Sequence, residues 1–226
     1  MKEDFKDFIE ASGLLEYDPD TISKIYRKNP KRLFKRLWQT LIPIFAYIIS
    51  VGFDKITGKL KNESQARYRA KQLTALLVEL GPAFVKAGQA LSTRPDIIPV
   101  VLLEELSQLQ DQLPGFSGDK AMELIEKDLD KNINDIFLKI DKDPISAASL
   151  GQVHKAILKD GEVVAVKVQR PGLREQITLD LYIVRNIAIW LKNNIGLIRS
   201  DLVALIDELG KRVFEEMDYI NEAENA

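Results

Sequence analysis

The sequence predicts an α+β chain in which helices precede and follow one small antiparallel sheet. Three observations predict this fold: helical spacing of apolar residues through residues 63–129, valine-rich strand patterns over residues 136–169, and long amphipathic patterns over residues 173–225. The 226 residues are 46% hydrophobic and 29% charged, which is typical of a globular protein that can fill a core.

The composition excludes several classes of protein. The chain has no cysteine and one histidine, His154, so it cannot form disulfides, thiolate metal sites or a pair of catalytic imidazoles. Its 32 basic and 34 acidic residues nearly cancel, so a general nucleic-acid footprint is absent and we expect no nucleic-acid partner. The acidic first 20 residues resemble neither a secretion signal nor a transit peptide, so we expect a protein that is not secreted.

Residues 23–53 combine a basic segment with an apolar one. Residues 23–36 carry lysines and arginines but no acid, and residues 37–53 are uncharged and rich in aromatic side chains. The apolar run is shorter than the roughly 20 residues of a spanning helix and is interrupted by polar residues and Pro43, so a spanning helix is the least favoured interpretation. Two interpretations remain: contact with the surface of an anionic membrane, or a core helix with a solvated basic edge. We expect membrane association on the reducing side, with the bacterial cytoplasmic face favoured over a plastid or mitochondrion.

Each later element has a local signal. A helix over residues 63–80 ends at Gly81, and Pro82 can begin the next helix, over residues 82–92. The sequence then predicts helices over residues 99–111 and 119–129, strands over 136–140, 152–158 and 162–169, and helices over 173–192 and 201–225. Asp160-Gly161 is typical of the tight turn of a hairpin and joins the last two strands.

The hairpin carries the most informative side chain. Alternation places Ala165 and Lys167 on one face of the last strand and the intervening valines on the other. A lysine that points inward from a valine strand is costly to bury unless it meets an anion. The preceding small-residue connection, residues 144–151, allows close backbone approach to a ligand, as in kinases that hold nucleotide phosphates. The alternative is an ordinary edge-strand lysine.

The last predicted helix carries acids that need explanation. Glu216 falls inside its apolar stripe, whereas Asp218 and Glu222 fall on the far side. A glutamate in an apolar stripe needs a partner, and Lys86 and Lys167 are candidates. The alternatives are a margin position for Glu216 and a solvated face for the other two acids.

The helix after Pro82 presents a second polar group of residues. Lys86 and Gln89 are three positions apart and share a face. Gly88 in a helix interior costs about 1 kcal/mol relative to alanine, so close packing or ligand approach would explain it. By spacing alone, this is a helix-packing seam with a polar edge.

Several stretches of the chain match one family in the same order. They read GPAFVKAGQALSTRPDIIP, LQDQLPGF, PISAASLGQVHKA, GEVVAVKVQRPGL and EEMDYINEAENA. Together, over residues 63–226, they resemble the UbiB-type atypical kinases, also called aarF-domain kinases. The first contains the family's Lys-x-Gly-Gln motif, and the third resembles its alanine-rich phosphate loop, in which Ser146 departs from the usual alanine. The fourth carries the nucleotide-site lysine, and the last resembles the Glu-x-Asp motif.

The resemblance implies a nucleotide site. Lys167 would contact the phosphates of ATP or ADP and pair with Glu222. The phosphate loop would be lined by Ala147, Ala148, Ser149 and Gly151. Over the pocket, the family motif residues Lys86, Gly88 and Gln89 would meet Glu216 or Asp218.

The resemblance also implies the domain organisation. It implies a helical extension (63–130) packed on a kinase-like N-lobe (131–226), and it leaves residues 1–62 as a separate N-terminal segment. No catalytic-loop aspartate and no Asp-Phe-Gly follow Lys167, so we assign no catalytic residue and expect the Mg²⁺ ligands in a C-lobe absent from this chain.

Two functions are compatible with this organisation. The family implies an ATPase or small-molecule kinase that supports isoprenoid quinone or related lipid metabolism at a membrane, with a quinone or lipid precursor as partner. The alternative is a catalytically silent, membrane-associated scaffold or pseudokinase fragment.

Overall fold

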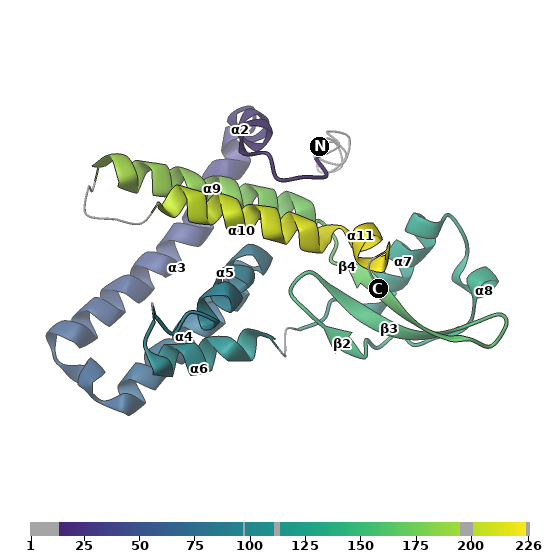
Figure 1. Ribbon diagram of the computed structural model, residues 1–226, viewed down its shortest axis with the longest axis horizontal. Coiled ribbons are helices and arrows are strands. Elements are labelled where there is room, and N and C mark those ends of the chain that lie inside the picture. The colour runs from purple at the N-terminus through teal and green to yellow at the C-terminus, as the bar shows by residue number, and fades with distance from the viewer. Residues whose placement is uncertain (1–13, 97, 111–113, 195–200, 225–226) are drawn as a thin grey trace. The chain divides into compact units, whose positions relative to one another are not determined.

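The computed structural model describes residues 14–96, 98–110, 114–194 and 201–224 (Figure 1). The predicted α+β fold is confirmed, since helices dominate the described residues and the strands form one small antiparallel sheet. The chain divides into two compact units. A helical unit joins the residues up to 107 with those from 174 onward, and a sheet unit spans residues 108–173.

The helical unit consists of elements from both ends of the sequence. They are α2 (Pro19–Arg27), α3 (Pro30–Ile56), the 3-10 helix η1 (Lys59–Lys61), α4 (Glu63–Leu80), α5 (Pro82–Ser92), α6 (Val100–Ser107), α9 (Leu173–Asn194), α10 (Leu202–Met217) and α11 (Tyr219–Glu224). Helix α4 contacts α3, α5 and α6, and α5 also contacts α10. Local signals begin and end these helices: Asp18 and Asn62 cap α2 and α4, and proline begins α2, α3 and α5.

Long-range polar contacts hold residues 17–36 against α9 and α10. The Tyr26 hydroxyl lies 2.7 Å from Thr178 Oγ1 in a buried site. Arg36 donates to both carboxylate oxygens of Asp180, at 2.6 and 2.8 Å. Tyr17 donates to Asp207 at 2.7 Å, and desolvation by burial raises the pKa of its phenol. Residues 14–36 therefore pack on helices that lie more than 140 residues later in the chain.

Gly81 permits a close approach at the turn between α4 and α5. Its φ of 111° is a backbone conformation that residues with a Cβ rarely adopt. A Cβ at this position would also lie 2.3 Å from Gln176 Nε2 on α9. The turn is held from the α3 side too, because Arg36 Nη2 donates to the Leu80 carbonyl.

The sheet unit contains a four-stranded antiparallel sheet with α7 (Gly118–Leu129) on one face. The strands are β1 (Phe137–Ile140), β2 (Ser146–Ala147), β3 (Gly151–Leu158) and β4 (Val163–Gln169), and β3 pairs with each of the others. The short elements η2 (Gln108–Gln110) and α8 (Ile133–Ile136) precede α7 and β1. Ala121 and Ile125 of α7 pack with Phe137, Ala156 and Val168 in the core.

Three of the predicted elements need correction. The helix expected over residues 99–111 ends at Ser107 and tightens into η2. The connection 144–151 contains the short strand β2, which the small-residue pattern did not indicate. The continuous helix expected over residues 201–225 is wrong, because the backbone leaves helical geometry at Asp218, whose carboxylate then accepts the Asn221 N–H of α11.

Helix α3 is not the core helix that one interpretation of residues 23–53 predicted. Its large apolar side chains lie mostly in solvent, and only Thr40 and Asp54 are buried. By length and composition alone, α3 could cross a membrane.

Candidate functional site

One face of the β3–β4 hairpin is open. The predicted alternation is confirmed: Val164, Val166 and Val168 turn towards α7, whereas Ala165 and Lys167 are exposed on the other face. Across the ladder, Val153 pairs with Lys167 and Lys155 pairs with Ala165. The open face therefore presents Lys167 beside a short-chain apolar surface.

The inward orientation expected for Lys167 does not bury the residue in this structure. The residue is exposed, because α7 covers only the opposite face of the sheet. The cost of burying a charge is therefore no argument for a ligand at Lys167. What distinguishes Lys167 is its position on the open face, opposite Val153, which itself pairs with Ser146 of β2 at the small-residue loop.

The small-residue loop turns tightly next to this face. Its β2 residues Ser146 and Ala147 pair with Val153 and Gln152 of β3, and the Ala148 N–H donates to the Gly151 carbonyl at 2.8 Å. Ser149 is buried and Ala148 is exposed. Of the predicted loop residues, Ala148 therefore lies open to a ligand, whereas the Ser149 side chain points into the protein.

Arg170 holds the loop, and sequence reasoning missed it. Its Nε and Nη2 donate to the Ala148 carbonyl at 3.1 and 2.9 Å, and Nη2 also donates to the Pro114 carbonyl at 2.7 Å. Its guanidinium lies 6.0 Å from the centre of the Phe116 ring. A planar group with several fixed donors suits this task, because it can bridge two carbonyls at once. The only local signal was its place directly after β4.

Replacing Arg170 with alanine should increase amide hydrogen exchange in residues 146–151 at least tenfold, since even one hydrogen bond from a charged group contributes about 1.5 kcal/mol. Arg170→Lys should recover little, because an ammonium lacks the planar fork. Hydrogen-exchange mass spectrometry of the intact protein measures this, with Lys155→Ala as the matched control on the same hairpin. Unchanged exchange in Arg170→Ala would show that the backbone alone holds the loop.

His154 is a core residue behind the hairpin. It is fully buried, its Nδ1 lies 2.9 Å from the Asp141 carbonyl, and its Nε2 lies 3.0 Å from Gln152 Nε2. Gln152 Oε1 in turn accepts the Phe116 N–H at 2.9 Å. Because a carbonyl only accepts, Nδ1 carries the proton and Nε2 accepts from the glutamine. This relay ties the loop around residues 114–116 to β3 and serves a structural purpose.

The second predicted group of residues lies in the helical unit. Lys86 of α5, which is mostly buried, forms an ion pair with Glu216 of α10. Gly88 is buried and Gln89 half-buried on the same helix. Asp218 is used locally, since its carboxylate accepts the Asn221 N–H at 3.1 Å and the Asn221 side-chain amide at 2.7 Å. Of the two acids expected near Lys86, the structure therefore pairs Glu216 with it.

Glu222 is exposed on α11. It belongs to the helical unit and Lys167 belongs to the sheet unit, so their pairing stays a prediction.

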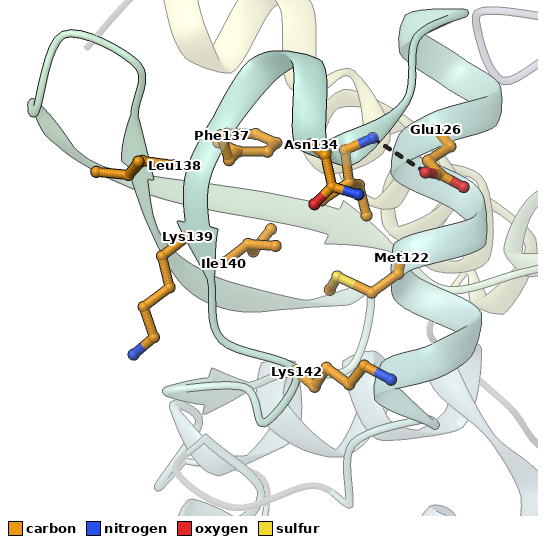
Figure 2. Close-up of a pocket in the computed structure, with 9 residues that line it drawn as sticks. Met122, Glu126, Asn134, Phe137, Leu138, Lys139, Ile140 and Lys142 are labelled. Atoms are coloured by element: carbon orange, nitrogen blue, oxygen red, sulfur yellow. Dashed lines mark hydrogen bonds between the residues drawn. The ribbon is translucent and has the colours of Figure 1, made fainter.

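A separate pocket of about 420 Å³ lies between α7, α8 and β1 (Figure 2). Met122 and Ile140 face each other across it, and none of the predicted site residues lines it. Its charged groups already have partners: Glu126 accepts the Ile133 N–H, and Lys142 donates to Asp119 at 2.6 Å and lowers the pKa of that carboxyl. We therefore assign no ligand to this pocket.

Comparison with known proteins identifies the family of the chain. The ABC1 atypical kinase-like domain matches residues 108–226, more than half of the chain. The chain belongs to this family. The match includes the whole sheet unit, with Lys167, the small-residue loop and Arg170, together with α9 to α11.

Relatives of this ABC1-family chain occur in cyanobacteria and plants. An uncharacterized protein of Synechocystis is 49% identical over 93% of this chain and 30% of its own length. In Arabidopsis thaliana, an uncharacterized chloroplastic aarF domain-containing protein kinase is 47% identical over 96% of this chain and 31% of its own length. The chloroplastic protein ACTIVITY OF BC1 COMPLEX KINASE 3 is 42% identical over 93% of this chain and 29% of its own length.

One solved structure, of Mycobacterium tuberculosis Rv3197 with erythromycin, is 34% identical, with a TM-score of 0.41 over 74% of this chain and 41% of that chain. The ABC1-family chain spans about 30% of the length of the relatives named above.

Proposed function

We propose that this chain is the nucleotide-binding small lobe, with its helical extension, of an atypical kinase or ATPase. The observation that carries the proposal is the open face of the β3–β4 hairpin, where Lys167 lies opposite Val153, next to a loop that Arg170 holds in place. ATP or ADP would lie against this face. In this family, a lysine on such a strand is expected to neutralise nucleotide phosphates.

The residues present suit a nucleotide. The Lys167 ammonium can donate to the α- and β-phosphates, and the apolar side chains of Val153 and Ala165 offer a surface for the base. Ala148 carries only a methyl group, so a phosphate can lie close to the loop without a steric clash. Glu222 would pair with Lys167 and orient it, whereas Ser149 and Gly151, both buried, would shape the loop from behind.

We assign the metal ligands to a second lobe. Within residues 14–96, 98–110, 114–194 and 201–224, no group of three acids or histidines could hold a metal ion. Mg²⁺ bound with the nucleotide would neutralise charge on its phosphate oxygens.

We further propose that the phosphoacceptor, if the protein transfers a phosphoryl group, is a small molecule. In this proposal Lys86, Gly88 and Gln89 cover the pocket, and the ion pair between Lys86 and Glu216 fixes that cover. A covered pocket obstructs a protein substrate and leaves room for an isoprenoid quinone or related lipid precursor. The quinone or lipid class of this acceptor comes from the family resemblance; one relative is named for the activity of the BC1 complex.

Titration calorimetry of the intact protein with ATP, ADP and AMP, with and without Mg²⁺, tests the nucleotide site. We expect ATP or ADP to bind at least tenfold more tightly than AMP, because AMP lacks the β-phosphate that Lys167 contacts. Equal affinities would contradict the assigned role of Lys167. No binding of any nucleotide would favour the alternative of a catalytically silent scaffold.

A further inference from the structure

Helix α3 presents its apolar side chains to solvent along its whole length. Eight large apolar residues of α3 each have between 49% and 88% of their surface exposed: Phe34, Trp38, Ile42, Phe45, Ile48, Ile49, Phe53 and Ile56. At 100° per residue they occupy an arc of roughly 140°, so they form one continuous stripe, here called the α3 stripe. The helix is about 40 Å long at 1.5 Å per residue.

The opposite face of α3 is polar and packs inward. Arg36 and Asp54 are five helical turns apart, so they lie on one side of the helix. Arg36 binds Asp180 of α9, and Asp54 accepts from Arg69 Nε of α4 at 2.6 Å. Between them, the Tyr47 hydroxyl donates to the Arg69 carbonyl at 3.2 Å. A helix on the surface of a water-soluble protein normally has the reverse arrangement, with its apolar face inward.

This arrangement distinguishes a helix that lies on a membrane from one that crosses it. A crossing helix is surrounded by hydrocarbon or by other apolar helices. Here α3 packs against α4 near one end and crosses α9 near the other (Figure 1), and both neighbours carry the charged partners of its inward face. Crossing would draw those ion pairs into hydrocarbon, whereas lying flat inserts the stripe alone.

The charges around the α3 stripe indicate which surface it fits. Lys31 and Lys35 are exposed on the same side as the stripe, at its N-terminal end, and Lys55 is exposed near the other end. Residues 30–53 contain no acid, and the first acid of α3, Asp54, faces inward. An apolar stripe with aromatic side chains and flanking lysines complements anionic head groups over acyl chains.

We propose that the α3 stripe docks lengthwise on the surface of an anionic lipid bilayer. Its aromatic and aliphatic side chains enter the boundary between head groups and acyl chains, and Lys31 and Lys35 contact lipid phosphates. This inference is independent of the nucleotide site, because it rests on α3 and its neighbours in the helical unit.

The two tryptophans of the chain allow a direct test. Trp38 lies in the α3 stripe at 49% exposure, whereas Trp190 lies on α9 at 58% exposure. The full chain carrying Trp190→Phe reports on Trp38 alone, and Trp38→Phe reports on Trp190 alone. With phosphatidylglycerol vesicles that contain brominated lipid, Trp38 fluorescence should shift to shorter wavelength and be quenched at least twofold, and Trp190 fluorescence should not change. Quenching of Trp190 alone, or of both equally, would overturn the proposal.

Binding strength gives a second, independent measurement. In vesicle flotation, Phe45→Glu with Ile49→Glu should reduce partitioning at least tenfold, whereas Leu138→Glu, an exposed apolar residue on β1, should leave it unchanged. Lys31→Glu or Lys35→Glu should each reduce binding to anionic vesicles at least fivefold, since each lysine contributes about fivefold. Wild-type partitioning in the Phe45→Glu/Ile49→Glu protein would overturn the proposal. So would a concentration-dependent dimer that these substitutions abolish, because the stripe would then meet a second copy.

Discussion

Lys167→Ala should weaken the binding of ATP or ADP by roughly tenfold to a hundredfold, because a hydrogen bond between charged groups contributes about 1.5–3 kcal/mol. The residue is exposed on the open face of the hairpin, so its removal leaves no cavity and should not affect folding. Titration calorimetry on the intact protein measures the affinity, and thermal unfolding without nucleotide measures the stability.

Lys155→Ala is the matched control for this experiment. Lys155 is exposed, lies on the same face of the hairpin and pairs with Ala165 across the ladder, so its loss changes the general charge of the face by the same amount. We expect Lys155→Ala to bind nucleotide within about threefold of the wild type, since surface charges at a distance are screened. Equal losses in the two variants would mean that nucleotide responds to overall charge and that Lys167 has no specific contact.

Arg36→Ala should destabilise the protein by about 3–5 kcal/mol at pH 7, the usual cost of leaving one partner of a buried ion pair alone. The Asp180 side chain is fully buried, and Arg36 donates to both of its carboxylate oxygens. Arg36 also donates to the Leu80 carbonyl, so one substitution loosens α3, α9 and the end of α4 together. Urea unfolding followed by circular dichroism measures the loss.

Two variants control for the charge of Asp180 and for the general loss of an arginine. The double variant Arg36→Ala/Asp180→Asn should be more stable than Arg36→Ala alone, because it no longer buries an uncompensated charge. Arg94→Ala removes an arginine from an exposed pair with Asp96 and should leave the urea midpoint almost unchanged. If Arg36→Ala also left it unchanged, α3 would be held mainly by its other contacts.

The loss in Arg36→Ala should depend on pH. Desolvation raises the pKa of Asp180 in the folded protein, and Arg36 opposes this rise. Removing Arg36 therefore raises this pKa further, and a folded carboxyl with a raised pKa loses stability as pH rises from the unfolded value of about 3.9 through the folded value. The destabilisation should thus be largest at pH 7 and shrink as pH falls towards 4. A loss that is constant over this range would mean that Asp180 stays ionised throughout.

Much of the secondary structure could be predicted from local interactions. The helices over residues 63–80 and 82–92, the hairpin turn at Asp160-Gly161 and the alternation that exposes Lys167 all follow from interactions between near neighbours in the chain, which periodicity reports directly. Asp218 shows the limit of this reasoning. Its surroundings continue a helical pattern, but its short carboxylate caps a new helix instead.

By itself, the sequence determined most of the helices and strands after residue 62 and which side chains share a hairpin face with Lys167, because both depend on residues a few positions apart. Only the tertiary structure decided that Arg36 meets Asp180, that Lys86 meets Glu216, that Arg170 holds the loop and that the apolar side of α3 faces outward. The physical reason is the same in each case. A basic or apolar residue looks alike in sequence wherever it points, and packing between distant segments chooses its partner and its face.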